Sequence, residues 1–231
     1  MKRFYKTATA TEQDGAYQIS LDKRLVKTPL NNVIVLPSKS LAENIAKEWD
    51  EQGDVLDMDA MPLTQLAYTY TDKVLTQRDE IIAGLIPYLE TELICFYSEN
   101  PPELYDAQKD LWQPIADWFK SETGITLNAV TDIFTKAYSE DDQNRFKTAL
   151  DALSDFELTA LQATAALISS SVLSFALVKQ HIDADTVFKA AFIEELHQAE
   201  QWGQDPAAEN KRNGIKADLQ HIAAFLKATT S

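Results

Sequence analysis

The stretch LTALQATAALISSSVLSFALV at residues 158–178 carries no charge and decides how the second half of the chain folds. Its length would suffice for a membrane span. However, seven of its residues are Thr, Gln or Ser, and no Trp or Tyr belt or cluster of basic residues flanks it. We therefore expect a single central helix that the rest of a folded domain buries. Ser154 and Glu157, at capping-box spacing, predict its start.

Further helices are predicted on both sides of this run. Apolar residues at helical spacing predict one helix that ends near Gly124, one over residues 146–153, and two more over residues 184–201 and 207–227. Residues 125–129 alternate briefly between apolar and polar, as in a strand.

The breaker Asn100-Pro101-Pro102 precedes these helices and predicts a domain boundary. We predict a strand-rich N-terminal domain with packed helices over residues 1–100 and an α-helical C-terminal domain over residues 101–231. The fold class is then α+β, with an N-terminal antiparallel β-rich α/β domain followed by a mostly α-helical domain.

Antiparallel strands are predicted for residues 1–37. Residues 17–21 alternate between apolar and polar, and Asp14-Gly15 ahead of them has the composition of a two-residue hairpin turn. A short apolar run at residues 33–36 follows. Together these segments predict three or four strands.

The spacing of apolar residues then changes to that of helices. Residues 40–52 are predicted as a helix that Ser40 caps and Gly53 ends. Pro62 suits the first turn of a second helix. A third helix, over residues 78–93, is expected to kink or break at its internal Gly and Pro.

The chain is acidic, with 36 Asp and Glu against 21 Lys and Arg and a formal net charge of −15. This charge is opposite to what a protein needs to bind nucleic acid or an anionic membrane, so both classes are disfavoured. The first thirty residues differ, because their basic side chains outnumber the acidic ones, and this asymmetry could orient a charged protein partner. The basic residues of this segment are Lys2, Arg3, Lys6, Lys23, Arg24 and Lys27.

The single cysteine, Cys95, cannot form an internal disulfide, which fits a reducing compartment. It lies in the apolar run at residues 93–97, so we expect a buried, inert thiol and no catalytic nucleophile. The start of the chain lacks the apolar core of a signal peptide and the composition of a transit peptide. We therefore expect a cytoplasmic protein.

A metal site is the strongest case for an enzyme. Glu194 and His197 have Glu-x-x-His spacing, and Asp218 and His221 repeat the carboxylate-x-x-His offset on the next predicted helix. Carboxylate-bridged metal sites use such pairs, but they also need inward Glu residues on two further helices, which the uncharged run 158–178 does not supply. We favour a solvated acidic face, with no metal, no cofactor and no catalytic residue.

An apolar stripe on the predicted helix near residue 195 contains a carboxylate. Glu195 must pair with a Lys or Arg, reach the edge of the stripe, or face a partner, because burying a lone charge is costly. Glu194 lies on the adjoining flank, and Trp202, just before Gly203, is explained most simply by packing back on its helix. Trp49 continues the stripe of another helix and is predicted to be a core residue. The stripe itself, at steps of 4, 3, 4 and 3, consists of Phe188, Phe192, Glu195, Ala199 and Trp202.

Several segments, taken in order along the chain, resemble the ATP-twelve-type chaperones, the assembly factors of the F-type ATP synthase that bind its alpha subunit. The matching segments are KRFYK at 2–6, LDKR at 21–24, KTP at 27–29, EWDEQ at 48–52, MPLT at 61–64, WQP at 112–114, SSVL at 170–173 and EQWGQD at 200–205. The chain departs from the family at Glu92 and Phe96, where Asp and Tyr are more frequent, and at Ser169 or Ser170, where a Gly is usual.

The resemblance implies a non-enzymatic chaperone that holds free alpha subunit and covers the surface that the beta subunit later occupies. We also predict a monomer, in the cytoplasm of a bacterium or in the mitochondrial matrix of a eukaryote. The resemblance places a functionally important acidic residue at Glu194 or Glu195, and we predict Glu194, Glu195 and Trp202 as the partner-binding residues. Of these two carboxylates, the apolar stripe favours Glu195 as the important one. The resemblance also singles out Trp49, as a residue needed for folding and not for contact with the partner. Two hypotheses compete with this one: a metal-dependent enzyme, and an adaptor for another protein client.

Overall fold

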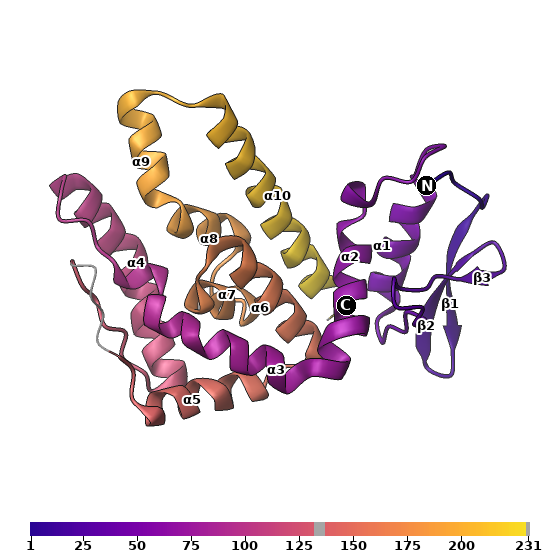
Figure 1. The fold of residues 1–231 in the computed structure, drawn as a ribbon, viewed down its shortest axis with the longest axis horizontal. Helices are drawn as coiled ribbons and strands as arrows, with labels where there is room; N and C mark the ends of the chain where they lie inside the picture. Colours follow the sequence, from indigo (N-terminus) through magenta and orange to yellow (C-terminus); the bar gives the residue numbers. More distant parts are fainter. Residues whose placement is uncertain (132–136, 230–231) are drawn as a thin grey trace. The chain divides into compact units, whose positions relative to one another are not determined.

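A computed structural model describes residues 1–131 and 137–229 (Figure 1). The chain packs into two compact units. We call the first the N-terminal unit; it comprises residues 1–78, 155–160 and the chain from His221 onward. The second, the helical unit, comprises residues 79–154 and 161–220. The predicted domain boundary at residue 100 stays a prediction.

The N-terminal unit contains a three-stranded antiparallel sheet in the order β1-β2-β3. The strands are β1 (Ala8–Gln13), β2 (Ala16–Leu21) and β3 (Arg24–Leu25). Asp14 and Gly15 join β1 to β2 and both have positive φ, as a type I′ hairpin turn requires. The predicted hairpin and the α+β fold class are confirmed. The apolar run at residues 33–36 makes isolated bridges and is not a strand of its own.

Helix α1 (Lys39–Asp50) packs against β1 and β2. Its N-cap is Ser38, whose Oγ accepts a hydrogen bond from the backbone N of Leu41 at 3.2 Å, so the prediction that Ser40 caps this helix was wrong. The helix ends at Asp50, and Gly53 therefore lies beyond its terminus. One face of α1 is buried, as the spacing predicted: Leu41, Ala42, Ile45, Ala46 and Trp49.

Helix α2 (Pro62–Thr69) starts at the predicted proline. Its N-terminus is capped from α1, because the carboxylate of Glu48 accepts hydrogen bonds from the backbone N of Leu63 at 2.7 Å and of Thr64 at 2.8 Å. A carboxylate is well placed there, since the free N–H groups of a helix start carry partial positive charge. Burial nevertheless raises the pKa of Glu48 above its ordinary value.

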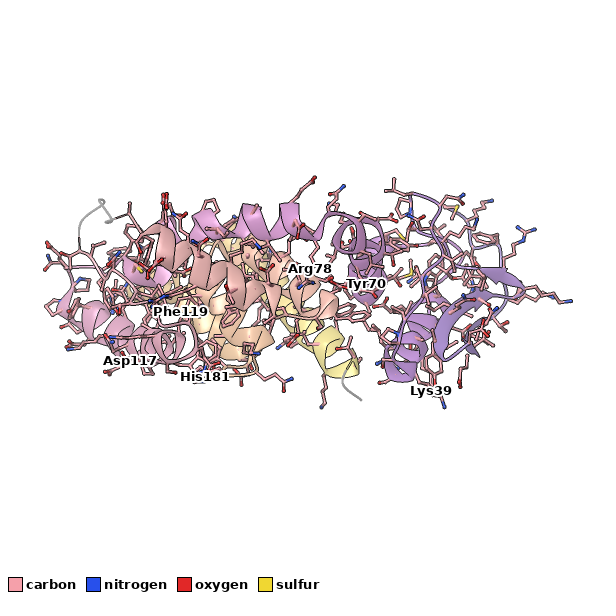
Figure 2. The ribbon with its side chains drawn as sticks, turned by 90° about the horizontal axis from the view of Figure 1, so that it is seen from below. Lys39, Tyr70, Arg78, Asp117, Phe119 and His181 are labelled. Atoms are coloured by element: carbon pink, nitrogen blue, oxygen red, sulfur yellow. The ribbon has the colours of Figure 1, made fainter. Side chains whose placement is uncertain are left out.

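After α2 the chain forms a π-helical turn (Tyr70–Val74), helix α3 (Leu75–Leu85) and a 3₁₀ segment (Ile86–Thr91). The change from α to 3₁₀ geometry falls next to Pro87, which is consistent with the predicted break. In the N-terminal unit, the ring of Tyr70 stacks on Phe156 with centroids 4.1 Å apart, and Arg78 pairs with Asp155 (Figure 2).

The helical unit contains the long helix α4 (Pro102–Thr123) and helix α5 (Glu140–Asp151). Gly124 ends α4 with φ of 73°, a left-handed conformation that glycine adopts without strain, and this confirms the predicted end. Residues 125–129 form no strand, so that prediction was wrong; the next residue, Val130, makes an isolated bridge to Phe96. The fully buried Phe119 of α4, labelled in Figure 2, belongs to an aromatic cluster in which its ring, Phe146 and Phe175 contact one another.

The uncharged run at residues 158–178 forms two helices, and the prediction of a single one was wrong. Helix α6 (Asp155–Ile168) stops before Ser169, whose φ of 54° is left-handed, and α7 (Ser171–Val178) follows with every residue buried. Ser170 caps α7, since its Oγ accepts a hydrogen bond from the backbone N of Leu173 at 3.0 Å. Among the described residues, no helix is long and apolar enough to cross a membrane.

The start of α7 surrounds a buried carboxylate. Glu92 is fully buried and accepts hydrogen bonds from the hydroxyls of Ser170 and Ser171 and from the backbone N of Val172 at 3.0 Å. Two of the serines that make residues 158–178 too polar for a membrane thus act at this site: Ser170 caps α7, and both Ser170 and Ser171 donate to a buried carboxyl group.

The C-terminal segment forms α8 (Ala184–Ala191), α9 (Ile193–Trp202) and α10 (Pro206–Thr229). A single helix was predicted over residues 184–201, but Phe192, with φ of −116° and ψ of 17°, interrupts it. The last helix confirms its prediction and carries a buried stripe that includes Leu219, Ile222 and Leu226.

Replacing Trp49 with Arg should lower the free energy of unfolding by about 3 kcal/mol or more, because a cation would replace a packed indole. Trp49 is 5% exposed, and its carbonyl accepts a 2.6 Å hydrogen bond from the hydroxyl of Tyr5. Trp202→Arg is the matched control, since Trp202 is 81% exposed. Urea unfolding of both variants measures the difference, and a Trp49→Arg protein as stable as the wild type would contradict a core role for Trp49.

Glu92→Gln should change how stability depends on pH. Burial raises the pKa of Glu92, so the folded chain holds this proton to higher pH than the unfolded chain, in which the pKa is about 4.3. The contribution of Glu92 to stability is therefore fully present below the unfolded pKa and is lost as pH rises through the folded pKa.

The free energy of unfolding of Glu92→Gln, taken relative to the wild type, should accordingly increase as pH rises from about 4 to 8. Urea unfolding at a series of pH values measures this. The exposed Glu99, replaced by Gln, provides the control. Parallel stability curves for Glu92→Gln and the wild type would contradict the assignment.

Candidate partner-binding site

Helix α9 carries the predicted partner-binding residues and contains no buried residue. Its first turn holds Glu194 and Glu195, and Phe192 precedes it without a side-chain cap. The two carboxylates at this helix start are favourable for the helix dipole. Ile193, Leu196 and Ala199 are half-buried, so polar contacts supplement a limited apolar packing in holding α9.

Glu194 is one of these contacts. Its Oε1 accepts hydrogen bonds from Nε2 of Gln108 on α4 at 2.8 Å and from the hydroxyl of Ser98 at 3.0 Å. Gln108 is fully buried, and its own Oε1 accepts from the backbone N of Ser98 at 2.8 Å. The sequence analysis missed Gln108, although its position four residues after Leu104 and four before Trp112, on the buried face of α4, was a usable signal.

Glu195 makes the second contact. Its Oε2 lies 3.3 Å from Nη1 of Arg212 on α10. The side chain of Arg212 is only 8% exposed, whereas that of Glu195 is 54% exposed. Glu195 therefore makes an ion pair with a basic residue, which was one of the possibilities that the sequence left open for it. Because half of its surface faces solvent, the same carboxylate can also meet a partner.

Trp202, at the C-terminal end of α9, does not pack back on its helix, so that prediction was wrong. Its side chain is 81% exposed, the largest exposed fraction among the large apolar residues that the structure describes. Trp202 lines a cleft together with Glu194 and His197 of α9, and with Pro101 and Leu104 at the start of α4. An exposed indole beside acidic side chains is typical of a contact surface between proteins.

The metal hypothesis finds no support in the geometry. Within residues 1–131 and 137–229, no group of three or more His, Cys, Asp or Glu is placed to hold a metal ion. Glu194 instead accepts hydrogen bonds from uncharged groups. Cys95 is buried, as predicted, and burial raises the pKa of its thiol to about 12, so it is a poor nucleophile at neutral pH.

Comparison with known proteins identifies the family. Residues 2–120 match the family described as ATP12 chaperone protein, which is more than half of the chain. The chain belongs to the ATP12 chaperone family. Members of this family are not enzymes, and the chain is an assembly chaperone for ATP synthase.

Relatives of this ATP12-family chain occur in bacteria and in mitochondria. The crystal structure of Atp12 from Paracoccus denitrificans is 31% identical, with a TM-score of 0.91, over 99% of this chain and 98% of that one. The mitochondrial protein atp12 of Schizosaccharomyces pombe is 25% identical over 96% of this chain and 81% of its own length. The mitochondrial ATP12 of Saccharomyces cerevisiae is 27% identical, over 92% and 79% respectively.

Gln108→Ala should loosen α9. It removes the buried amide that holds Glu194 and leaves the backbone N–H of Ser98 without its acceptor, which should lower the free energy of unfolding by about 2 kcal/mol. Amide hydrogen exchange in α9 should accelerate relative to the wild type, and by a larger factor than in α4 or α7. The exposed Gln201, replaced by Ala, is the control. Unchanged exchange in α9 would show that Gln108 does not hold this helix.

Proposed function

We propose that this chain binds the free alpha subunit of ATP synthase through α9 and covers the alpha surface that the beta subunit later occupies. The observation that supports this most strongly is Trp202, an 81% exposed indole on a helix that also presents the half-exposed Glu195. The site residues predicted from the sequence, Glu194, Glu195 and Trp202, form the partner-binding surface in this proposal.

The chemistry of this surface suits a protein client. A large exposed aromatic side chain contributes most to affinity where a partner excludes water from it. Glu195 offers a carboxylate to a basic group of the client, which adds specificity more than affinity. Its hydrogen-bonded pairing with Arg212 fixes the direction of the carboxylate before the client arrives, so that less ordering is needed on binding.

The proposed mechanism needs no nucleotide and no chemical step. Binding an alpha subunit lowers the concentration of the unprotected interface by mass action, and with it the rate of aggregation. Release follows when the beta subunit competes for the same surface. The net charge of −15 keeps the complex soluble and speeds the encounter with basic regions of the client. Within this proposal the chain acts as a monomer in the bacterial cytoplasm, or in the mitochondrial matrix of a eukaryote.

Trp202→Ala should weaken binding to purified alpha subunit by about tenfold or more, as expected for a central aromatic contact, without changing thermal stability. Glu195→Gln should weaken binding less, because it removes the charge but keeps an acceptor for Arg212. Glu200→Gln is the matched control, since Glu200 is exposed on the same helix. Isothermal titration calorimetry of each variant with the alpha subunit measures the affinities.

A 1:1 complex of the wild type with the alpha subunit is the expected result. Failure of the wild type to bind this subunit would overturn the proposal, and recovery of a different protein as its stable partner would replace it with an adaptor function. Equal affinities for Trp202→Ala and the wild type would move the contact surface away from α9.

A further inference from the structure

The N-terminal unit contains an apolar groove that the proposed function does not use. Phe4 and Leu25, which are 53% and 40% exposed, line it together with Met1 and Met58. Trp49, Leu56 and Tyr68 also contribute to its lining. Large apolar side chains that remain exposed and gather in one groove mark an interaction site more often than scattered surface residues do. We call this site the Phe4 groove.

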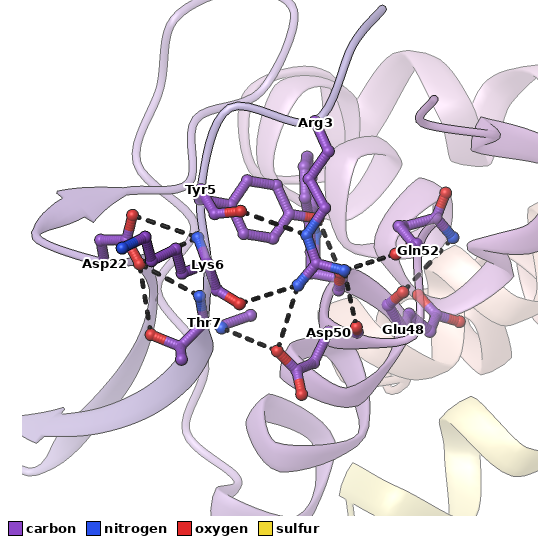
Figure 3. Close-up of polar contacts among 10 residues, drawn as sticks. Arg3, Tyr5, Lys6, Thr7, Asp22, Glu48, Asp50 and Gln52 are labelled. Carbon is purple, nitrogen blue, oxygen red and sulfur yellow. Dashed lines mark hydrogen bonds and ion pairs between the residues drawn. The ribbon is translucent and has the colours of Figure 1, made fainter. Parts of the chain in front are cut away.

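The residues around Phe4 hold it in place. The backbone N of Arg3 donates to the carbonyl of Asp54 at 2.9 Å, and the hydroxyl of Tyr5 donates to the carbonyl of Trp49. The guanidinium of Arg3 also donates to the carbonyls of Tyr5, Lys6, Asp50 and Gln52 (Figure 3). Phe4 lies between two anchored neighbours, so its exposure is a property of the fold. A fixed, exposed aromatic side chain loses little conformational entropy when a partner covers it.

The charge around the groove differs from that of the whole chain. Arg24 and Lys27 line the Phe4 groove, whereas the chain carries a formal net charge of −15. The side chain of Arg24 makes no hydrogen bond or ion pair with the residues that the structure describes, and that of Lys27 donates only to Oδ1 of Asn31. Two of the six basic residues in the first thirty positions thus lie at this groove. An apolar groove with unneutralised cations at its edge suits a segment that carries both apolar side chains and carboxylates.

We propose that the Phe4 groove is a second docking site for the client, and that it takes a segment of the alpha subunit in which large apolar side chains adjoin Asp or Glu. This inference rests on the proposed function and adds to it a contact on the N-terminal unit. Two contacts of moderate strength on one client raise the overall affinity without requiring either to be tight.

The apolar part of the proposal is tested by the double substitution Phe4→Ser and Leu25→Ser. The affinity for purified alpha subunit, measured by calorimetry, should fall by about tenfold or more. Leu75→Ser is the matched control, because Leu75 is an exposed leucine of the same unit that does not line the groove. It should bind within about twofold of the wild type. Thermal unfolding of each variant verifies that the fold is retained.

The charged part is tested by Arg24→Glu, with Lys73→Glu as the control for the same reversal at an exposed site outside the groove. Arg24→Glu should weaken binding by about fivefold and reduce its dependence on salt concentration, because a screened attraction is replaced by repulsion. Lys73→Glu should do neither.

The outcomes separate this inference from the proposed function. If the wild type binds alpha subunit and the groove variants bind as tightly as their controls, the Phe4 groove is not a docking site and the proposed function stands. If the wild type does not bind alpha subunit at all, both fail. Self-association of the wild type in sedimentation velocity, abolished by the Phe4→Ser and Leu25→Ser substitutions, would identify a second copy of this chain as the occupant and overturn the assignment to the client.

Discussion

The helical unit depends on a carboxylate that has no contact with water. Glu92 sits at the start of α7, where two serine hydroxyls and one backbone N–H donate to it. An ionised or protonated carboxyl in such a place is tolerated only when its hydrogen bonds are satisfied. The same requirement fixes the break between α6 and α7, because the donors are available only if α7 starts at Ser171. Glu48 meets the start of α2 in the N-terminal unit in the same way.

The distance along the chain between the residues of a contact explains which features of the fold the sequence could predict. Signals that act within a few residues were read correctly: the Asp14-Gly15 hairpin, the start of α2 at Pro62 and the end of α4 at Gly124. The break at Ser169 was missed, since apolar periodicity continues through it and its stabilising partner, Glu92, is 78 residues away from Ser170. Phe192 was missed for a related reason, because no Gly or Pro marks the break between α8 and α9.

The candidate site stays a prediction, but the surroundings of its residues can be compared with what the sequence indicated. The pattern of residues drew attention to Glu194, Glu195 and Trp202, which lie together on α9. It also left open an ion pair for Glu195 without indicating the partner, because Arg212 is 17 residues away on another helix. The exposure of Trp202 could not be deduced from the sequence, because the apolar stripe was drawn on one unbroken helix over residues 184–201. Once Phe192 ends α8, residues on its two sides no longer share one apolar face.

The absence of buried residues in α9 has a thermodynamic consequence. Undocking α9, whose apolar residues are at most half-buried, should change heat capacity and denaturant sensitivity less than undocking the fully buried α7, since both quantities scale with the area exposed. The hydrogen bond of Glu194 and the ion pair of Glu195 also oppose undocking of α9. Raising the ionic strength should therefore favour the undocked helix, because salt screens the ion pair between Glu195 and Arg212.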